Sequence, residues 1–241
     1  MSSPGKTFTV AFALYPGCTL LDFAGATQIF AYVPGFRVVW LAATSDPIAT
    51  TEGISVMPNA TFDDALKSEL SPDVVFVPGG GGDGVTAAMT ESRIQGFLKT
   101  AGPKAEWAGS VCTGAFVAAA AGLFDHCTVT TYWSARDALA LFPQLVVVPG
   151  YPRWEIDEKK HRFSGGGVSS SIDLALELVR RIAGESAAES TQLANQYAPQ
   201  PPVNAGDPNH ASPELVITTT QGQAEMNAQL TATVNALTGQ A

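Results

Sequence analysis

Short hydrophobic runs alternate with stretches of helical periodicity along the first half of the chain. Four runs rich in Val, Phe and Ala have the length of buried strands, at residues 8–14, 36–43, 73–79 and 106–111. Apolar residues at helical spacing follow three of these runs, at 20–33, 91–101 and 113–124. Strands buried on both faces carry continuous hydrophobic runs, and helices alternating with them cover both faces of a parallel sheet. This order predicts an α/β sandwich with a mainly parallel sheet.

The second half of the chain predicts shorter elements. They are a strand at 128–133, a helix near 134–141, a strand at 145–150, a hairpin at 153–167 and an amphipathic helix at 172–182. The hairpin follows from alternating residues on both sides of the polar turn DEKK, and serines precede the helix as capping residues. We expect one domain over residues 1–241, with no internal repeat or linker.

Proline marks the C-terminal region. The stretch 197–213 contains five prolines, which favours an extended strap over a helix or strand. A last helix is expected at about 213–237. Its apolar positions are sparse, so we expect it to pack more weakly than the others.

Composition and charge limit the classes of partner that we expect this protein to bind. The 241 residues are 46% hydrophobic, which suits a sizeable buried core, and the net charge is -9. Without a run of Lys and Arg, nucleic acid is not an expected partner. We find no segment near the roughly 20 apolar residues that span a bilayer and no signal-peptide pattern. The three cysteines are far apart, so we expect a cytoplasmic protein with no metal site and no membrane partner.

Cys112 is the strongest candidate nucleophile. It lies in AGSVCTGAF, where a predicted strand ends and a helix begins, and small residues on both sides allow a sharp turn. Ligands of parallel α/β sheets bind at this edge, and the N–H groups of a helix start favour a thiolate. A free cysteine is more often an ordinary core residue, but this position favours reactivity.

Two other features can serve such a nucleophile. Asp22 lies in the first turn of the first predicted helix, where it can either exchange protons with Cys112 or simply interact favourably with the helix dipole. The glycine run in 77–84 follows another strand, and its N–H groups can form an oxyanion hole or only a flexible turn.

The other cysteines and the histidines give weaker signals. Cys18 follows the first strand and can line the same pocket, whereas Cys127 at a strand start is expected to be buried packing. None of His126, His161 and His210 has an obvious place beside Cys112. A Cys-His dyad is therefore poorly supported.

The sequence resembles the DJ-1/PfpI superfamily, and within it the isonitrile hydratases. The resemblance is carried by LLDFAGA, VPGGGG, SVCTGAFVAAAAGLF, TTYW, SGGGVSSSIDLALELV and QYAPQPPVNAGDP, over about residues 8–215. It implies a flavodoxin-like sandwich, a homodimer and a cofactor-free enzyme with a small-molecule substrate.

The same resemblance assigns roles to residues. Cys112 falls on the family nucleophile and Asp22 on the acid that hydrogen-bonds it. Thr113 falls on the residue that helps to position substrate or water, and Gly79 and Gly80 fall on backbone donors facing the thiol.

One position departs from the pattern. Many members of the superfamily have His where this chain has Tyr132, and a phenol is a poor base at neutral pH. Asp22 is then the main proton donor and acceptor, and Tyr132 donates a hydrogen bond, shapes the pocket or merely packs. The expected activity is hydration of isonitriles to N-substituted formamides through a cysteine thioimidate. The alternatives are a glyoxalase acting on reactive carbonyls and a cysteine redox or ligand sensor.

Overall fold

A mainly parallel sheet forms the centre of the molecule. The computed structural model describes residues 7–68 and 70–240, and within these a seven-stranded sheet has the order β10-β11-β7-β6-β1-β2-β5. Its strands are β1 (Phe8–Ala13), β2 (Phe36–Ala42), β5 (Ala60–Thr61), β6 (Val74–Val77), β7 (Trp107–Val111), β10 (Trp154–Asp157) and β11 (Arg162–Gly165). Neighbouring strands run parallel except at the β10/β11 pair. The predicted α/β sandwich is confirmed.

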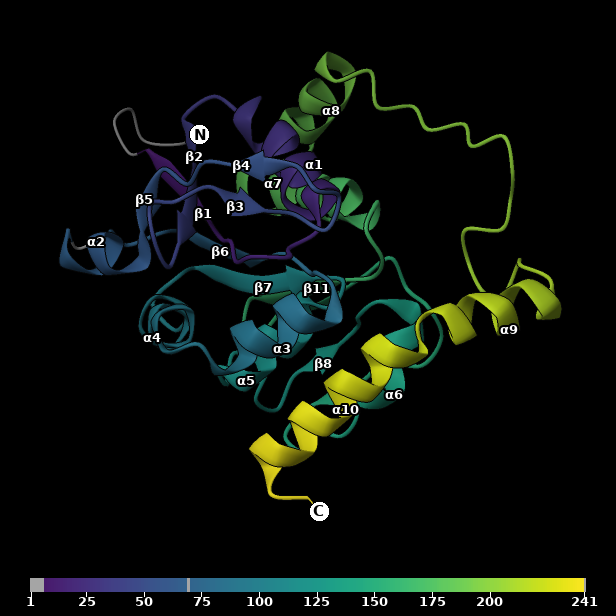
Figure 1. The fold of residues 1–241 in the computed structure, drawn as a ribbon. Helices are drawn as coiled ribbons and strands as arrows, with labels where there is room; N and C mark the ends of the chain where they lie inside the picture. Colours follow the sequence, from purple (N-terminus) through teal and green to yellow (C-terminus); the bar gives the residue numbers. More distant parts are fainter. Residues whose placement is uncertain (1–6, 69, 241) are drawn as a thin grey trace.

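Helices cover both faces of this sheet (Figure 1). On one face lie α1 (Leu20–Ala31), α7 (Ser170–Ala183) and α8 (Glu185–Ala194). The other face carries α3 (Gly82–Thr90), α4 (Ser92–Ala101) and α5 (Gly114–Ala120), with the short α2 (Phe62–Lys67) packed against α4. Cys112 and the glycine run therefore lie between a buried strand and the helix that follows it, and Asp22 lies in the first turn of α1.

The remaining elements are short or peripheral. They are β3 (Ile48–Ala49), β4 (Ser55–Val56), β8 (Thr128–Val129), β9 (Val146–Val147), the 3-10 helix η1 (Trp133–Ala135), α6 (Arg136–Leu139), α9 (Pro213–Gly222) and α10 (Ala224–Thr238). Two small sheets form from β3 with β4 and from β8 with β9. None of the helices in the described part of the chain is long and apolar enough to cross a membrane.

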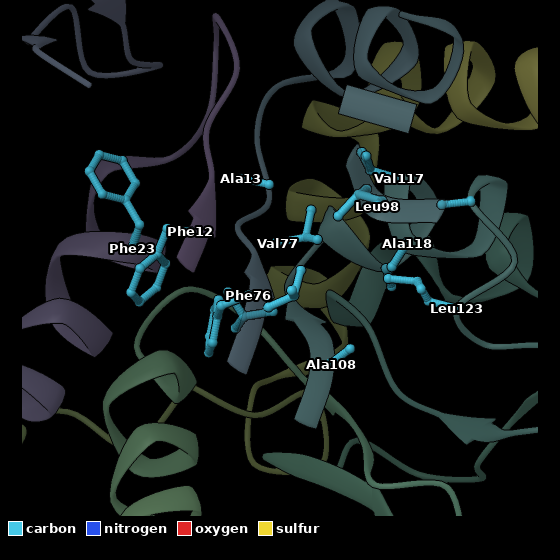
Figure 2. Close-up of a cluster of buried hydrophobic side chains, with 14 of the residues drawn as sticks. Phe12, Ala13, Phe23, Phe76, Val77, Leu98, Ala108, Val117, Ala118 and Leu123 are labelled. Atoms are coloured by element: carbon cyan, nitrogen blue, oxygen red, sulfur yellow. The ribbon is translucent and has the colours of Figure 1, made fainter. Parts of the chain in front are cut away.

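The core lies on both sides of the central strands. Every residue of β6 and β7 is buried, as is β1 after its first residue. Figure 2 shows part of this core, in which Phe12 and Phe76 stand opposite each other on β1 and β6 with ring centroids 4.9 Å apart. Continuous burial of this kind requires the uninterrupted hydrophobic runs seen in the sequence.

Most predicted elements are present, with differences in length. The hairpin at 153–167 is confirmed as β10 and β11. The strands expected at 128–133 and 145–150 shrink to two residues each and pair with each other outside the main sheet. Helices α3 and α8 were not predicted, because one opens on the glycine run and the other is rich in small polar residues.

The C-terminal region divides into three parts. Residues 197–212 contain no helix or strand, as the prolines predict, and most of them are exposed. Figure 1 shows this strap passing outside the body between α8 and α9. The single helix expected at 213–237 is two helices. Within it α9 has no buried residue, whereas α10 packs on α3 and α6 through the fully buried Leu230 and Val234, so the weak packing we expected holds for α9 alone.

Candidate active site

Cys112 forms a strained elbow between β7 and α5. Its φ angle is 57°, in the left-handed region that a side chain other than that of glycine enters at a cost of roughly 1–2 kcal/mol. Its N–H donates to the carbonyls of Gly165 and Gly166 at 3.0 and 2.8 Å, and its carbonyl accepts a hydrogen bond from Thr131 Oγ1 at 2.7 Å. These bonds hold the sharp turn that the small residues around Cys112 predict.

Glycine at position 114 permits this elbow. A Cβ at Gly114 would lie 2.5 Å from the carbonyl oxygens of Val77 and Pro78. Helix α5 can therefore approach the end of β6 only with glycine at its first residue. The close approach brings Cys112 beside the loop that follows β6.

Asp22 is a buried acid beside the thiol. It is fully buried in the first turn of α1, and its Oδ2 accepts the Gly79 N–H at 2.7 Å. Its Oδ1 has no hydrogen-bond partner among the described residues, and the carboxyl group interacts with the Cys112 side chain. Burial raises the pKa of Asp22 to about 8, although hydrogen bonds from Gly79 and Cys112 act in the other direction. Asp22 is therefore a neutral carboxylic acid at pH 7.

The Cys112 thiol is also protonated at rest. Burial raises its pKa, and the nearby Asp22 adds to the effect, while the N–H groups of Thr113 and Val168 and the Thr113 hydroxyl lower it. The thiolate expected at a helix start is thus not the resting form, because burial outweighs the N–H groups. The site holds a thiol and a carboxylic acid side by side, each with its proton.

The turn at Gly79 and Gly80 holds Asp22 and Thr113 in place beside Cys112. The Gly79 N–H is taken by Asp22, and the Gly80 N–H donates to Thr113 Oγ1 at 2.9 Å, while that hydroxyl donates to the Gly80 carbonyl at 2.9 Å. Both N–H groups therefore hold the residues that face the thiol. The N–H groups directed at sulfur come instead from Thr113 and Val168.

Two further side chains close the inner end of the site. Tyr15 is buried and its hydroxyl donates to the Pro78 carbonyl at 2.8 Å. Burial raises its pKa, and the fields of Cys18, Asp22 and Cys112 contribute. Cys18 is fully buried, pairs with Gly80 through an isolated bridge, and has its pKa raised to about 12 by burial. Cys18 is thus an inert thiol next to the acid rather than a second nucleophile.

A cavity of about 320 Å³ adjoins the elbow. Its walls include Thr131, Gly166 and Val168, which all hydrogen-bond Cys112. Leu21, Tyr132, Trp133, Tyr151, Pro152, Arg153 and the strap residues Gly206, Asp207 and Pro208 form much of the remaining wall. Cys112 itself is 5% exposed. A ligand in this cavity would approach the sulfur from the side of the β11–α7 turn.

Tyr132 shapes this cavity. Its ring packs on Gly167, where an added Cβ would lie 3.1 Å from the ring, and it stands 5.9 Å from the Trp133 ring between centroids. Burial raises its pKa and the nearby Cys112 adds to the shift, so Tyr132 is a neutral hydroxyl at pH 7. It can donate a hydrogen bond but cannot act as a base.

The histidines lie elsewhere. His161 stacks on Trp107 at 4.3 Å, and Trp107 begins β7, the strand whose other end leads to Cys112. His126 and His210 are exposed. Cys127 directly precedes β8 and is buried, as predicted. Among the described residues, Asp22 is thus the carboxyl group that lies beside the thiol.

The sequence did not single out three of the four further residues that contact the site, and Tyr15 was expected either to line an apolar pocket or to pack in the core. Thr131 fixes the Cys112 carbonyl, Val168 faces the sulfur, Tyr15 closes the inner wall, and Arg153 lines the cavity. Thr131 lay in the TTYW stretch and Val168 in the glycine-serine stretch, but no spacing rule links either to Cys112. Only the fold brings them together.

Comparison with known proteins places this site in a family. Residues 8–180 match the DJ-1/PfpI family. The chain is 32% identical over 207 residues to isonitrile hydratase of Pseudomonas putida, covering 86% of each chain. It is 30% identical to the HTH-type transcriptional regulator CdhR of Pseudomonas aeruginosa over 77% of this chain and 53% of that protein.

Solved structures agree in fold. A THiJ/PfpI family protein from Pseudomonas syringae superposes with a TM-score of 0.88 at 30% identity, covering 97% of this chain and 93% of that one. Drosophila melanogaster DJ-1beta superposes with a TM-score of 0.70 at 18% identity, covering 80% of this chain and all of that one. With the elbow cysteine, its buried acid and the glycine turn in the matched region, this chain belongs to the DJ-1/PfpI family.

Proposed function

We propose that this protein hydrates organic isonitriles to N-substituted formamides in the cytoplasm, without a cofactor. The observation that supports this proposal is that the buried Asp22 carboxyl, whose pKa burial raises to about 8, lies beside the buried Cys112 thiol. Hydration of an isonitrile through a thioimidate needs a sulfur nucleophile and a proton for the terminal carbon, and this pair supplies the two. The likeness to isonitrile hydratase of Pseudomonas putida supports the same reaction.

The first step adds the thiol across the terminal carbon. Asp22 gives its proton to that carbon while Cys112 sulfur forms a bond to it, and the thiol proton passes to Asp22. The product is a thioimidate, R–N=CH–S–Cys112, and no net charge is created. A neutral acid suits this step, because an ionised Asp22 would have no proton to give and would repel the sulfur as it gains charge.

The second step hydrolyses the thioimidate. Asp22 protonates the nitrogen and takes a proton from the attacking water, which forms a C–O bond at the same carbon. The C–S bond then breaks, its electrons leave on sulfur, and the sulfur regains a proton from the new hydroxyl through Asp22. Formamide leaves, and both groups return to their starting protonation.

The N–H groups of Thr113 and Val168 stabilise negative charge on the Cys112 sulfur in both steps. They already lower the pKa of Cys112 against the effect of burial. Hydrogen bonds to an anion are stronger than bonds to a neutral acceptor, so these two donors stabilise the sulfur most when it carries negative charge. Thr113 is held for this by its hydroxyl contacts with Gly80.

The cavity favours an uncharged, bulky substituent. Tyr132, Trp133 and Tyr151 offer aromatic surface, and Arg153 is paired with Asp173. A substituent of the size of a cyclohexyl or phenyl group fits a cavity of about 320 Å³.

Formamide production from cyclohexyl or p-nitrophenyl isocyanide tests the proposal. We expect turnover by the wild type and none by Cys112→Ala, with Cys127→Ala as the matched control because Cys127 is buried away from the site. Lactate production from methylglyoxal is measured in parallel. Turnover of methylglyoxal without turnover of either isocyanide would refute isonitrile hydration in favour of a glyoxalase, and loss of neither activity in Cys112→Ala would refute the nucleophile.

We also propose that the protein works as a homodimer. Several large apolar side chains near the strap are exposed, including Leu193 at 82% and Val203 at 73%. Exposed apolar side chains along a segment that its own body does not cover are typical of an interface. Light scattering of the purified protein tests this, and a monomer at micromolar concentration would contradict it.

A further inference from the structure

Arg153 stands between the site cavity and an outer groove. It lies directly before β10 and lines both the cavity beside Cys112 and a groove between β10, α7 and α8. The mechanism proposed above gives it no role. Its contacts nevertheless lead to the turn that faces the sulfur.

Arg153 holds the β11–α7 turn at several points. Its Nε donates to Asp173 Oδ2 at 2.6 Å in the first turn of α7, and its Nη2 pairs with the same oxygen. Its Nη1 donates to Ser169 Oγ at 3.2 Å, and its carbonyl accepts the Gly166 N–H at 2.9 Å. One residue thus binds both ends of the segment 166–169 and the helix that follows it.

That segment contacts Cys112 twice. The Gly166 carbonyl accepts the Cys112 N–H at 2.8 Å, and the Val168 N–H donates to the sulfur. Gly166 and Gly167 give the segment little stiffness of its own, because glycine leaves the backbone free to adopt many conformations. The direction of the Val168 N–H therefore depends on what holds the residues around it.

Asp173 extends the same network to the strap. Its second carboxylate oxygen, Oδ1, accepts a hydrogen bond from the Tyr197 hydroxyl at 2.6 Å, and Tyr197 begins the strap. Burial and this bond raise the pKa of Tyr197 to about 12, so the hydroxyl keeps its proton and donates. Asp173 is thereby fixed from two sides, by Arg153 and by Tyr197.

We propose that Arg153, with Asp173 and Tyr197, is a positioning residue that keeps the Val168 N–H directed at the Cys112 sulfur as negative charge develops there. The inference rests on the proposed function only in taking Cys112 as the nucleophile. Arg153 touches neither the sulfur nor the acid, and it acts through the turn. The guanidinium suits this task because its planar fork binds a carboxylate and a hydroxyl at once, which an ammonium group does not.

Substitutions in the network of Arg153, Asp173 and Tyr197 should affect the reactivity of Cys112 but not the stability of the fold. The Arg153 side chain is 47% exposed, and ion pairs at that exposure contribute little to folding. Substitutions that break these contacts should therefore leave the free energy of unfolding unchanged and lower the reactivity of the Cys112 sulfur. If the ion pair were only structural, the same substitutions would lower the free energy of unfolding and leave that reactivity unchanged.

The rate of Cys112 alkylation by iodoacetamide between pH 7 and 10, followed by peptide mass spectrometry, tests the proposal. We expect Arg153→Met to lower the rate constant of Cys112 alkylation across this pH range by roughly tenfold to a hundredfold, the loss expected for one hydrogen bond to a charged acceptor. Tyr197→Phe, which removes one hydroxyl, should lower the rate constant by less, and Arg153→Lys should lie between Arg153→Met and wild type. The groups facing Cys112, which are Asp22, Tyr15 and Tyr132, are unchanged in all three variants.

Arg180→Gln is the matched control. Arg180 also lies on α7 and forms ion pairs with Glu177 and Glu185, but at the opposite end of the helix. Its profile should equal that of wild type. A wild-type profile in both Arg153→Met and Tyr197→Phe would overturn the proposal, as would an equal loss of rate in Arg180→Gln. Alkylation needs no isonitrile, so a protein that fails to hydrate isonitriles but shows the expected series refutes the proposed function and leaves the positioning role standing.

Discussion

Replacing Asp22 by Asn should change how stability depends on pH. In the folded protein the pKa of Asp22 is about 8, against an ordinary value of 3.8, so the folded state binds one more proton than the unfolded chain between these two values. Stability linked to this group is present below pH 3.8 and is lost as pH rises toward 8, by about 1.4 kcal/mol per pH unit. Between pH 5 and pH 7 the loss comes to about 3 kcal/mol.

Asn removes this dependence while keeping the shape of the neutral acid. Its Oδ1 can accept the Gly79 N–H, and its amide group occupies the place of the carboxyl beside Cys112. The free energy of unfolding by urea is measured at pH 5, 6, 7 and 8 for both proteins. We expect the free energy of unfolding of Asp22→Asn, relative to that of wild type, to rise by about 1.4 kcal/mol for each pH unit. Glu177→Gln is the control, because arginines hold the pKa of Glu177 below its usual range and its own dependence lies below pH 5.

The same variant tests the chemistry. Asn cannot release and recover a proton, so turnover of cyclohexyl isocyanide should fall by at least a hundredfold, within the range attributed to a positioned general acid. In wild type, kcat/KM should decline above pH 8 as Asp22 ionises. Curves of stability against pH that run parallel for wild type and Asp22→Asn would refute the neutral acid, and with it the mechanism.

Three further substitutions have definite expected outcomes. Gly79→Ala should abolish turnover and cost several kcal/mol, because its Cβ would lie 2.6 Å from Cys112 Cβ and 2.8 Å from Asp22 Oδ2; wild-type turnover would contradict the geometry. Thr131→Val removes the hydroxyl that holds the Cys112 carbonyl and should lower stability by about 1–3 kcal/mol in urea unfolding, along with a fall in kcat, whereas an unchanged midpoint and kcat would show the bond to be dispensable. Leu230→Ala opens a cavity under α10 and should lower stability by about 2–5 kcal/mol with KM unchanged, and a loss below 1 kcal/mol would mean that α10 is not docked.

The sheet and the elbow could be predicted because they depend on local pattern. Buried strands need uninterrupted hydrophobic runs, and a sharp strand-to-helix turn needs small residues beside Cys112, so both leave a mark on neighbouring positions. Helix α3 left no such mark, since its first residues belong to a glycine run that also suits a flexible turn. The break between α9 and α10 at Gln223 directly follows Gly222, a residue type that often ends helices, and our prediction of one continuous helix did not weigh it.

For the chemistry of the site, the residues involved could be predicted from the sequence, but their protonation states could not. Asp22 and Cys112 were named from their positions, but the pKa of each depends on burial by residues far along the chain. The expectation of a thiolate was wrong for this reason, because desolvation outweighs the helix start. Arg153 and Tyr197 gave no sign of their joint contact with Asp173, since 44 residues and a change of layer separate them.

The left-handed backbone of Cys112 has a consequence for engineering. Glycine adopts this conformation without strain, so Cys112→Gly should relieve the elbow, just as Asp22→Asn relieves a buried acid. The two residues that would perform the reaction are thus among those whose loss the fold tolerates best. A library screened for heat resistance alone would be enriched in proteins that lack the proposed activity, so selection for that activity must be applied in every round.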